Sequence, residues 1–191
     1  MGTGRRIRGS TVVIFRSTEL EGVVIVELES TVDERGSFTR TFDAEIFAAE
    51  GLSAQVVQCS ISANPREGTL RGLHYQIAPH DERKIVRCSK GRVYDVVVDL
   101  RRDSSTHRRW LAVELSGDNM LSVLIPEGFA HGFQTLEDDS EVHYQITAAY
   151  APHASRGVRW DDPAFAIHWP EPPAGKRIVS ARDRAFPDYA A

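Results

Sequence analysis

Arg92-Val93-Tyr94-Asp95-Val96-Val97-Val98-Asp99-Leu100 is the longest of several short runs rich in β-branched and aromatic residues. Runs of this kind, bounded by turn residues, are typical of β-strands. Short strands separated by Gly, Asn, Asp or Pro favour a sandwich or barrel over an alternating α/β fold. The sequence therefore predicts an all-β protein, a double-sheet antiparallel jelly roll with one or a few short helices. The other runs are Val23–Leu28, Gln55–Ile61, Trp110–Leu115, Leu121–Ile125 and Glu141–Thr147.

Asp43–Glu50 is the one segment with a helical pattern, since it starts with Asp, is rich in Ala and is followed by Gly51. The segment Pro170-Glu171-Pro172-Pro173-Ala174-Gly175 cannot form a central strand and predicts an extended connection. At 191 residues we expect a single domain over 1–191. Its jelly-roll core should span about residues 20–170, with a C-terminal extension over 171–191.

The composition is that of an ordinary globular protein, with 41% hydrophobic and 26% charged residues. A net charge of −4 argues against a general nucleic-acid binder. The longest early apolar run, Val12 to Phe15, is too short for a signal sequence or a membrane span. We therefore expect a cytoplasmic protein that binds neither nucleic acid nor membrane. Cys59 and Cys88 match no metal-site spacing and are expected to be buried free thiols.

Two histidines lie in short, apolar, Gly-punctuated strand contexts. His74 lies in Thr69-Leu70-Arg71-Gly72-Leu73-His74-Tyr75-Gln76, and His131 in Ile125-Pro126-Glu127-Gly128-Phe129-Ala130-His131-Gly132-Phe133. A titratable imidazole beside Arg71, Lys84 and Arg87 suits acid–base chemistry on an anionic substrate. The same spacing also fits two satisfied core histidines.

Strand alternation bears on which side chains share a cavity. Tyr144 alternates with Val142 and Ile146, which predicts that its phenol points inward, as either a structural or a site group. Arg71 and His74 are three residues apart, so a regular strand would point them to opposite faces. Gly72 permits a bulge that could bring both to one cavity.

No metal or cofactor is expected. Jelly-roll metal sites of the cupin type need a pair of histidines two residues apart, whereas His74 is followed by Tyr75 and Gln76. His131 alone does not make a first coordination shell. The sequence has no Gly-rich dinucleotide or phosphate loop and no Gly-x-Ser-x-Gly elbow. Acid–base chemistry beside a ketone on the substrate is the reaction class that remains.

These motifs, taken together, resemble the nucleotide-sugar 3,5-epimerases of the deoxythymidine-diphosphate-4-dehydrorhamnose type. The similarity runs in order from Asp33-Glu34-Arg35-Gly36 to Ser180-Ala181-Arg182-Asp183, through the motifs of His74, Asp95–Asp99, His131 and Tyr144. It implies a cupin-like jelly roll and an isomerase that needs no cofactor. The implied substrate is a thymidine-diphosphate (dTDP) 4-keto-6-deoxyhexose.

The resemblance also implies roles for particular residues. His74 would remove a proton beside the C4 ketone, Asp183 would orient His74, and Tyr144 would return a proton on the opposite ring face. Lys84 would lie beside the ketone oxygen, with Arg71 and His131 lining the pocket. Arg35 and Phe38 would reach the nucleotide from a neighbouring subunit of a homodimer. Gln58 and Tyr150 match nucleotide or sugar contacts of the family.

Four further substrate-binding positions carry a residue that differs from the one common in the family: Arg40, Ser60, Ser155 and Arg182. Ala149 likewise replaces an aromatic residue.

The departures leave several points open. The sugar, the nucleotide, the pathway and the number of carbons inverted are not settled by the sequence. The alternatives are a 3- or 5-epimerase acting on one carbon, a ketoisomerase on a related jelly roll, and a non-catalytic sugar-binding jelly roll.

Overall fold

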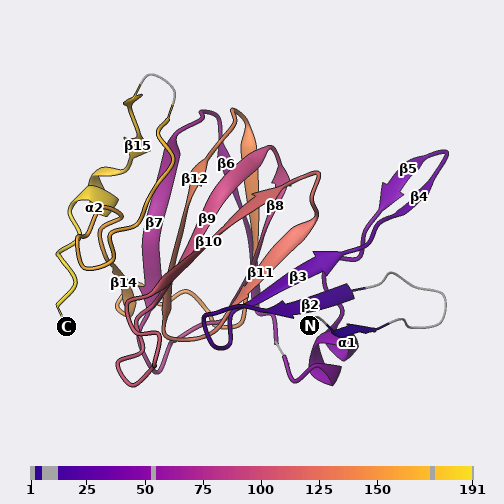
Figure 1. The fold of residues 1–191 in the computed structure, drawn as a ribbon, viewed down its shortest axis with the longest axis horizontal. Helices are drawn as coiled ribbons and strands as arrows, with labels where there is room; N and C mark the ends of the chain where they lie inside the picture. Colours follow the sequence, from indigo (N-terminus) through magenta and orange to yellow (C-terminus); the bar gives the residue numbers. More distant parts are fainter. Residues whose placement is uncertain (1–2, 6–12, 53–54, 173–174, 191) are drawn as a thin grey trace.

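The computed structural model describes residues 3–5, 13–52, 55–172 and 175–190. They form two sheets that enclose one core, and a separate two-stranded ribbon (Figure 1). The predicted double-sheet jelly roll is confirmed. All strand pairs are antiparallel among the described residues except that of β15 with β7.

The first sheet has seven strands, in the spatial order β1 (Thr3–Arg5), β2 (Val13–Ser17), β3 (Val24–Leu28), β11 (Leu121–Ile125), β8 (Lys84–Lys90), β13 (Ser140–Ile146) and β6 (Gln58–Asn64). The second has the order β10 (Trp110–Ser116), β9 (Arg92–Asp99), β12 (Phe129–Thr135), β7 (Thr69–Gln76) and β14 (Ser155–Gly157), with β15 (Ile178–Val179) beside β7. The ribbon consists of β4 (Thr31–Asp33) and β5 (Gly36–Phe38), and the helices are α1 (Ala44–Ala49) and α2 (Ala181–Arg184).

Three apolar layers follow from strand alternation. On β9, Val93 and Val97 point into the core between the sheets, whereas Val96 and Val98 point outward. The outward residues pack against Phe165 and Trp169 of the C-terminal region. A third cluster lies between α1 and the first sheet, where Ile46 and Phe47 meet Phe15, Val26 and Leu124. The apolar run of β9 is continuous because both of its faces are covered.

The helix expected at 43–50 is present. The Asp43 side chain caps α1 by accepting hydrogen bonds from the backbone N–H groups of Glu45 and Ile46. Gly51 follows with φ +74°, the left-handed conformation that ends many helices. The short helix α2 was not predicted, although Ser180 caps it by accepting a hydrogen bond from the backbone of Asp183.

The bulge expected at Gly72 is also present, and it places two site residues. On β12, His131 lies opposite His74 and Phe133 lies opposite Arg71, so three steps on β7 face two steps on β12. Gly72 has φ +140°, and a Cβ there would lie 2.6 Å from Gly132 Cα. Only glycine permits this backbone and this close approach.

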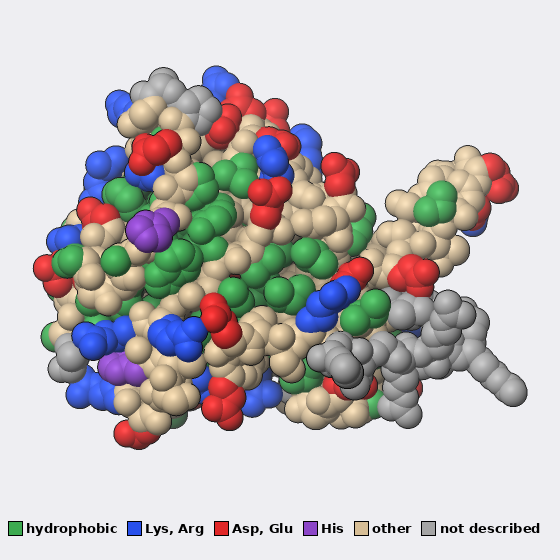
Figure 2. All heavy atoms as spheres, viewed as in Figure 1, with side chains coloured by type: hydrophobic (Ala, Val, Ile, Leu, Met, Phe, Trp, Pro, Cys, Tyr) green, Lys and Arg blue, Asp and Glu red, His purple; other side chains and the backbone are tan. Residues whose placement is uncertain are grey.

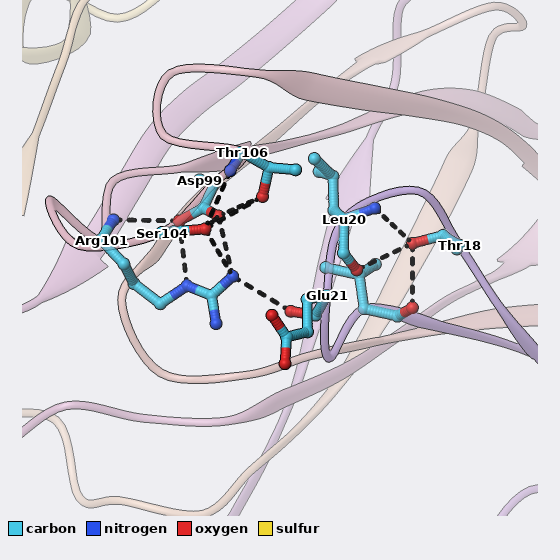
Figure 3. Close-up of polar contacts among 8 residues, drawn as sticks. Thr18, Leu20, Glu21, Asp99, Arg101, Ser104 and Thr106 are labelled. Carbon is cyan, nitrogen blue, oxygen red and sulfur yellow. Dashed lines mark hydrogen bonds and ion pairs between the residues drawn. The ribbon is translucent and has the colours of Figure 1, made fainter.

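A buried carboxylate joins the loop after β9 to the turn between β2 and β3 (Figure 3). Asp99 is fully buried, and it accepts hydrogen bonds from Arg101 Nη2 (2.8 Å), Ser104 Oγ (2.6 Å) and Thr106 Oγ1 (2.7 Å). Arg101 also donates to the carbonyl of Glu21 at 3.1 Å. Burial alone would raise the pKa of Asp99, but these hydrogen bonds outweigh it and lower the pKa to about 2.

The ribbon of β4 and β5 stands clear of the main body (Figure 2). Val32 is 73% exposed and Phe38 is 69% exposed, and all six residues of these two strands are exposed.

One prediction about the cysteines is wrong. Cys88 is buried in the core as expected, but Cys59 is exposed. It lies on β6, an edge strand whose only strand neighbour in the described sheet is β13, so one side of β6 is uncovered. In the expected connection over 170–175, residues 173 and 174 lie outside the described residues.

Candidate active site

A cavity of about 310 Å³ lies between the two sheets. The second sheet contributes β7, β12 and β14, and the first contributes β6, β8 and β13. Ten of the side chains proposed from the sequence line this cavity: Gln58, Ser60, Arg71, His74, Lys84, His131, Tyr144, Tyr150, Ser155 and Arg182.

His74 and Asp183 form a hydrogen-bonded pair at the cavity. His74 Nε2 lies 2.8 Å from Asp183 Oδ1, and the backbone N–H of Gly72 donates to Asp183 Oδ2 at 3.2 Å. The Asp183 side chain is 6% exposed, whereas that of His74 is 40% exposed. Burial would raise the pKa of Asp183, but the bonds from His74 and Gly72 lower it overall. An ionised Asp183 therefore fixes the tautomer of His74 and leaves Nδ1 available for a reaction partner.

Tyr144 enters the cavity from the opposite sheet, on β13, as the alternation predicts. Its ring packs edge to face with His131, with the ring centroids 5.9 Å apart. Burial raises the pKa of Tyr144 well above its usual value, and the nearby Asp95 raises it further, while Arg71 lowers it. The phenol therefore keeps its proton at neutral pH.

Two cations have defined acceptors. Lys84 is buried, and its Nζ lies 2.9 Å from Glu82 Oε1 and donates to the His74 carbonyl at 3.4 Å. Arg71 donates through Nε to Asn64 Oδ1 at 2.8 Å. Both cations can therefore be held in place before an anion binds.

A second histidine–carboxylate pair lies deeper in the cavity wall. His131 Nε2 lies 2.8 Å from Asp95 Oδ2, with side-chain exposures of only 4% and 0%. Asp95 belongs to the Asp95–Asp99 motif of the family resemblance, which implied no role for it. The available signal was an acid at an inward-facing position between Val93 and Val97, which needs a buried partner.

Sequence reasoning also missed several other residues that line the cavity. Gln76 is buried and donates through Nε2 to the His80 carbonyl, Glu82 Oε2 and the Ala149 carbonyl, at 2.9, 2.9 and 3.3 Å. Its Oε1 accepts from the Ala151 backbone at 2.7 Å. Its place at the end of the His74 motif was the only signal. The other lining residues without an expected role are Ser62, Tyr75, Glu82, Gly132 and Ile146.

Three expected substrate contacts do not reach this cavity. Arg35 pairs with Asp33 in the β4–β5 ribbon, where Phe38 also lies. Arg40 pairs with Asp43 at the start of α1, at 2.8 Å. That Arg35 and Phe38 serve a neighbouring subunit stays a prediction.

Within the described residues, no three His, Cys, Asp or Glu side chains come together in an arrangement that could hold a metal ion. Neither α1 nor α2, the helices in the described part of the chain, is long and apolar enough to cross a membrane.

The sequence profile of dTDP-4-dehydrorhamnose 3,5-epimerases matches residues 17–191. The chain belongs to the dTDP-4-dehydrorhamnose 3,5-epimerase family. It is therefore an isomerase of the 3,5-epimerase type. A curated relative of that name from Methanothermobacter thermautotrophicus is 44% identical over 170 residues, which cover 89% of this chain and 91% of the relative.

Solved structures of the family have the same fold. The dTDP-4-dehydrorhamnose 3,5-epimerase of Bacillus anthracis, solved with TDP and PPi bound, is 35% identical. It superposes with a TM-score of 0.87 over 92% of this chain and 98% of that one. A 3′-monoepimerase from Streptomyces bikiniensis, solved with dTDP-quinovose, is 31% identical, with a TM-score of 0.83 over 90% of this chain and 85% of that one.

Proposed function

We propose that this chain is a cofactor-independent epimerase that inverts C3, C5 or both of a dTDP-4-keto-6-deoxyhexose in deoxysugar biosynthesis. His74 is the base, Asp183 orients it, and Tyr144 is the acid. One observation carries the proposal: His74 on β7 and Tyr144 on β13 extend from opposite sheets into one cavity. A base and an acid on opposite faces of a sugar ring are what inversion of a carbon requires.

The steps balance without a cofactor. The C4 ketone acidifies the hydrogens on C3 and C5. Nδ1 of His74 takes one proton, and the C–H electron pair moves onto the C4 oxygen as an enolate. Tyr144 then gives its proton to the opposite face of that carbon, and the ketone re-forms. Solvent afterwards removes the proton from the imidazolium and returns one to the phenolate. Each positioned proton transfer contributes about 10²–10⁴-fold in rate.

The cationic side chains stabilise the negative charges of the substrate. Lys84, held by Glu82, stabilises the enolate oxygen, because a preorganised cation acts strongly on charge that develops beside it. His131, whose Nε2 is bound to Asp95, lines the pocket. Arg71 suits a diphosphate oxygen, and Arg182 adds a second guanidinium at the rim. Gln58, Ser60, Tyr150 and Ser155 supply polar contacts to the sugar and the nucleotide.

The second candidate is a single-carbon epimerase on a nucleotide-linked keto sugar. The likeness to the Streptomyces bikiniensis 3′-monoepimerase favours it, because that enzyme has the same fold at similar identity. Both candidates use the same base and acid, so they differ only in how many carbons exchange.

One experiment tests the proposal and separates the candidates. The protein is incubated with dTDP-4-keto-6-deoxyglucose in deuterated water, and NMR locates the label. Label and inversion at C3 and C5 indicate double epimerisation, and label at one carbon indicates the second candidate. No exchange with this donor, together with exchange on a cytidine or guanosine analogue, would overturn the nucleotide assignment.

Two variants test the division of labour. His74→Ala should abolish both exchange and inversion. Tyr144→Phe should still allow exchange on one face while inversion falls about 10²–10⁴-fold. Tyr94→Phe is the matched control, since Tyr94 belongs to the outer cluster of β9 and should leave both rates unchanged. Normal inversion by Tyr144→Phe would remove Tyr144 from the mechanism.

We further propose that the protein is a homodimer whose sites are shared between subunits. The projecting ribbon with exposed Val32 and Phe38 supports this, as does Ile61, 64% exposed on the edge strand β6. Arg35 lies on this ribbon and lines no part of its own chain's cavity. A two-fold pair is the commonest oligomer, and it would apply one chain's ribbon to the other chain's site.

Complementation tests this assembly directly. The His74→Ala protein, inactive alone, and the Arg35→Ala protein, weakly active alone, are unfolded together and refolded as a mixture. Half of the dimers should be mixed, each with one intact site, so about a quarter of wild-type activity should return. Light scattering should give the mass of a dimer. A monomer with full activity, or no recovery on mixing, would refute the shared site.

A further inference from the structure

On β14, the residue directly opposite His74 is a glycine, Gly157. Gly157 is the cross-strand partner of His74 in the antiparallel pair of β14 and β7, and side chains of such partners lie on the same face. Because Gly157 has no side chain, the face next to the imidazole is open at this position. The gap is filled by Phe186, which follows α2.

The fit between Gly157 and Phe186 is close. A Cβ on Gly157 would lie 2.3 Å from both Cε2 and Cζ of the Phe186 ring. These atoms are the far end of a side chain, so an added methyl group would displace the ring rather than the strand. The same ring packs edge to face against His74, with centroids 5.8 Å apart at 71°, and the Arg182 guanidinium lies 5.8 Å from its centroid.

Phe186 also lies between the anchors of the segment that carries Asp183. Upstream, β15 pairs with β7 and Ser180 caps α2. Downstream, the Tyr189 hydroxyl lies 2.9 Å from His107 Nε2. Between these anchors, Phe186 is the aromatic contact from this segment to the imidazole itself. It therefore contacts the ring whose Nε2 must stay 2.8 Å from Asp183.

We propose that Phe186 is a positioning residue for His74, and that Gly157 is glycine in this chain to admit its ring. The inference rests on the proposed role of His74 as the base. Without the ring, the imidazole can rotate about its side-chain bonds, and the bond to Asp183 is made for a smaller fraction of the time. The loss then falls on kcat, since Phe186 does not line the cavity that would hold the substrate.

Phe186→Ala should lower kcat for deuterium exchange about three- to tenfold, the equivalent of one aromatic pair contact, with KM nearly unchanged. In the free protein, the Nε2 proton of His74, followed by nitrogen-15 NMR, should exchange faster with solvent. Trp110→Leu is the matched control, since it removes a ring packed against His168 at 6.1 Å, away from the cavity. It should alter thermal stability but neither kcat nor the His74 signal.

A double-mutant cycle tests the role of Gly157. Gly157→Ala should lower kcat as Phe186→Ala does, and the double variant should be no worse than Phe186→Ala alone, because the clash disappears with the ring. Additive losses, or a normal kcat and His74 signal in Phe186→Ala, would overturn the inference. If His74→Ala retains exchange, it is the proposed function that fails, and the NMR signal still reports whether Phe186 orders the imidazole.

Discussion

Asp99→Asn should destabilise the protein by an amount that follows from one pKa. The carboxylate is fully buried, and its pKa is about 2 against 3.8 for an unperturbed Asp. At 1.36 kcal/mol for each pH unit between these two pKa values, the expected loss is roughly 2 kcal/mol at pH 7. The amide keeps the shape of the side chain but loses the charge that Arg101, Ser104 and Thr106 bind.

The pH dependence provides the sharper test. A group whose folded-state pKa is lowered stabilises the protein above its unfolded pKa, and this contribution is lost as pH falls through the folded pKa. The difference in free energy of unfolding between wild type and Asp99→Asn should therefore be constant above about pH 5 and fall to roughly half by pH 3. Urea unfolding measured between pH 7 and pH 3 gives both the stability loss at pH 7 and its decrease at low pH.

The matched control is an exposed ion pair that links the same two segments of the chain. Glu19 lies 2.8 Å from Arg109, with side-chain exposures of 54% and 55%. Glu19→Gln should change stability little at any pH, because an exposed ion pair is solvated in both states. If the stability difference between wild type and Asp99→Asn stays constant from pH 7 to pH 3, packing and not charge stabilises this loop.

Three further predictions concern the site. Asp183→Asn should lower kcat for exchange about 10²–10⁴-fold without unfolding the protein, because the amide can hold His74 in the wrong tautomer; kinetics and circular dichroism check this. Lys84→Met should lower kcat more than it raises KM, since its Nζ is held in the cavity wall and stabilises the enolate in the proposed mechanism; steady-state kinetics separate the two. Activity should survive dialysis against a strong chelator, because the cupin histidine pair is incomplete; loss of activity that a divalent ion restores would contradict this.

The fold followed from local sequence patterns. The run at 92–100 and the capped segment at 43–50 became β9 and α1, because alternation, caps and turn residues act over a few positions. At Gly72 the local pattern only permitted the observed bulge, and the reason to expect Arg71 and His74 at one cavity came from the family resemblance. Cys59 was misjudged because the position of β6 at the edge of its sheet depends on the whole topology.

The site was predictable only where the family resemblance supplied it. His74 and Asp183 are 109 residues apart, and no periodicity links a strand to the short helix α2 across that separation. His131 and Asp95 meet because β12 and β9 pair in a register that puts His131 opposite Val97 and Phe133 opposite Asp95. Register of this kind is set by tertiary packing, so the partner of His131 could not be read from the chain.

The two histidine–aspartate pairs differ in access to water, and this difference indicates which imidazole can be the base. A base must release its proton to solvent after each turnover. His74 is 40% exposed and keeps Nδ1 free of its partner, whereas His131 is 4% exposed and packs against Tyr144. A proton on the buried His131 would reach solvent less readily than one on His74, so His131 suits a fixed part of the pocket wall. Two pairs of the same chemistry thus take different proposed roles because one lies at the surface of the cavity and the other in its wall.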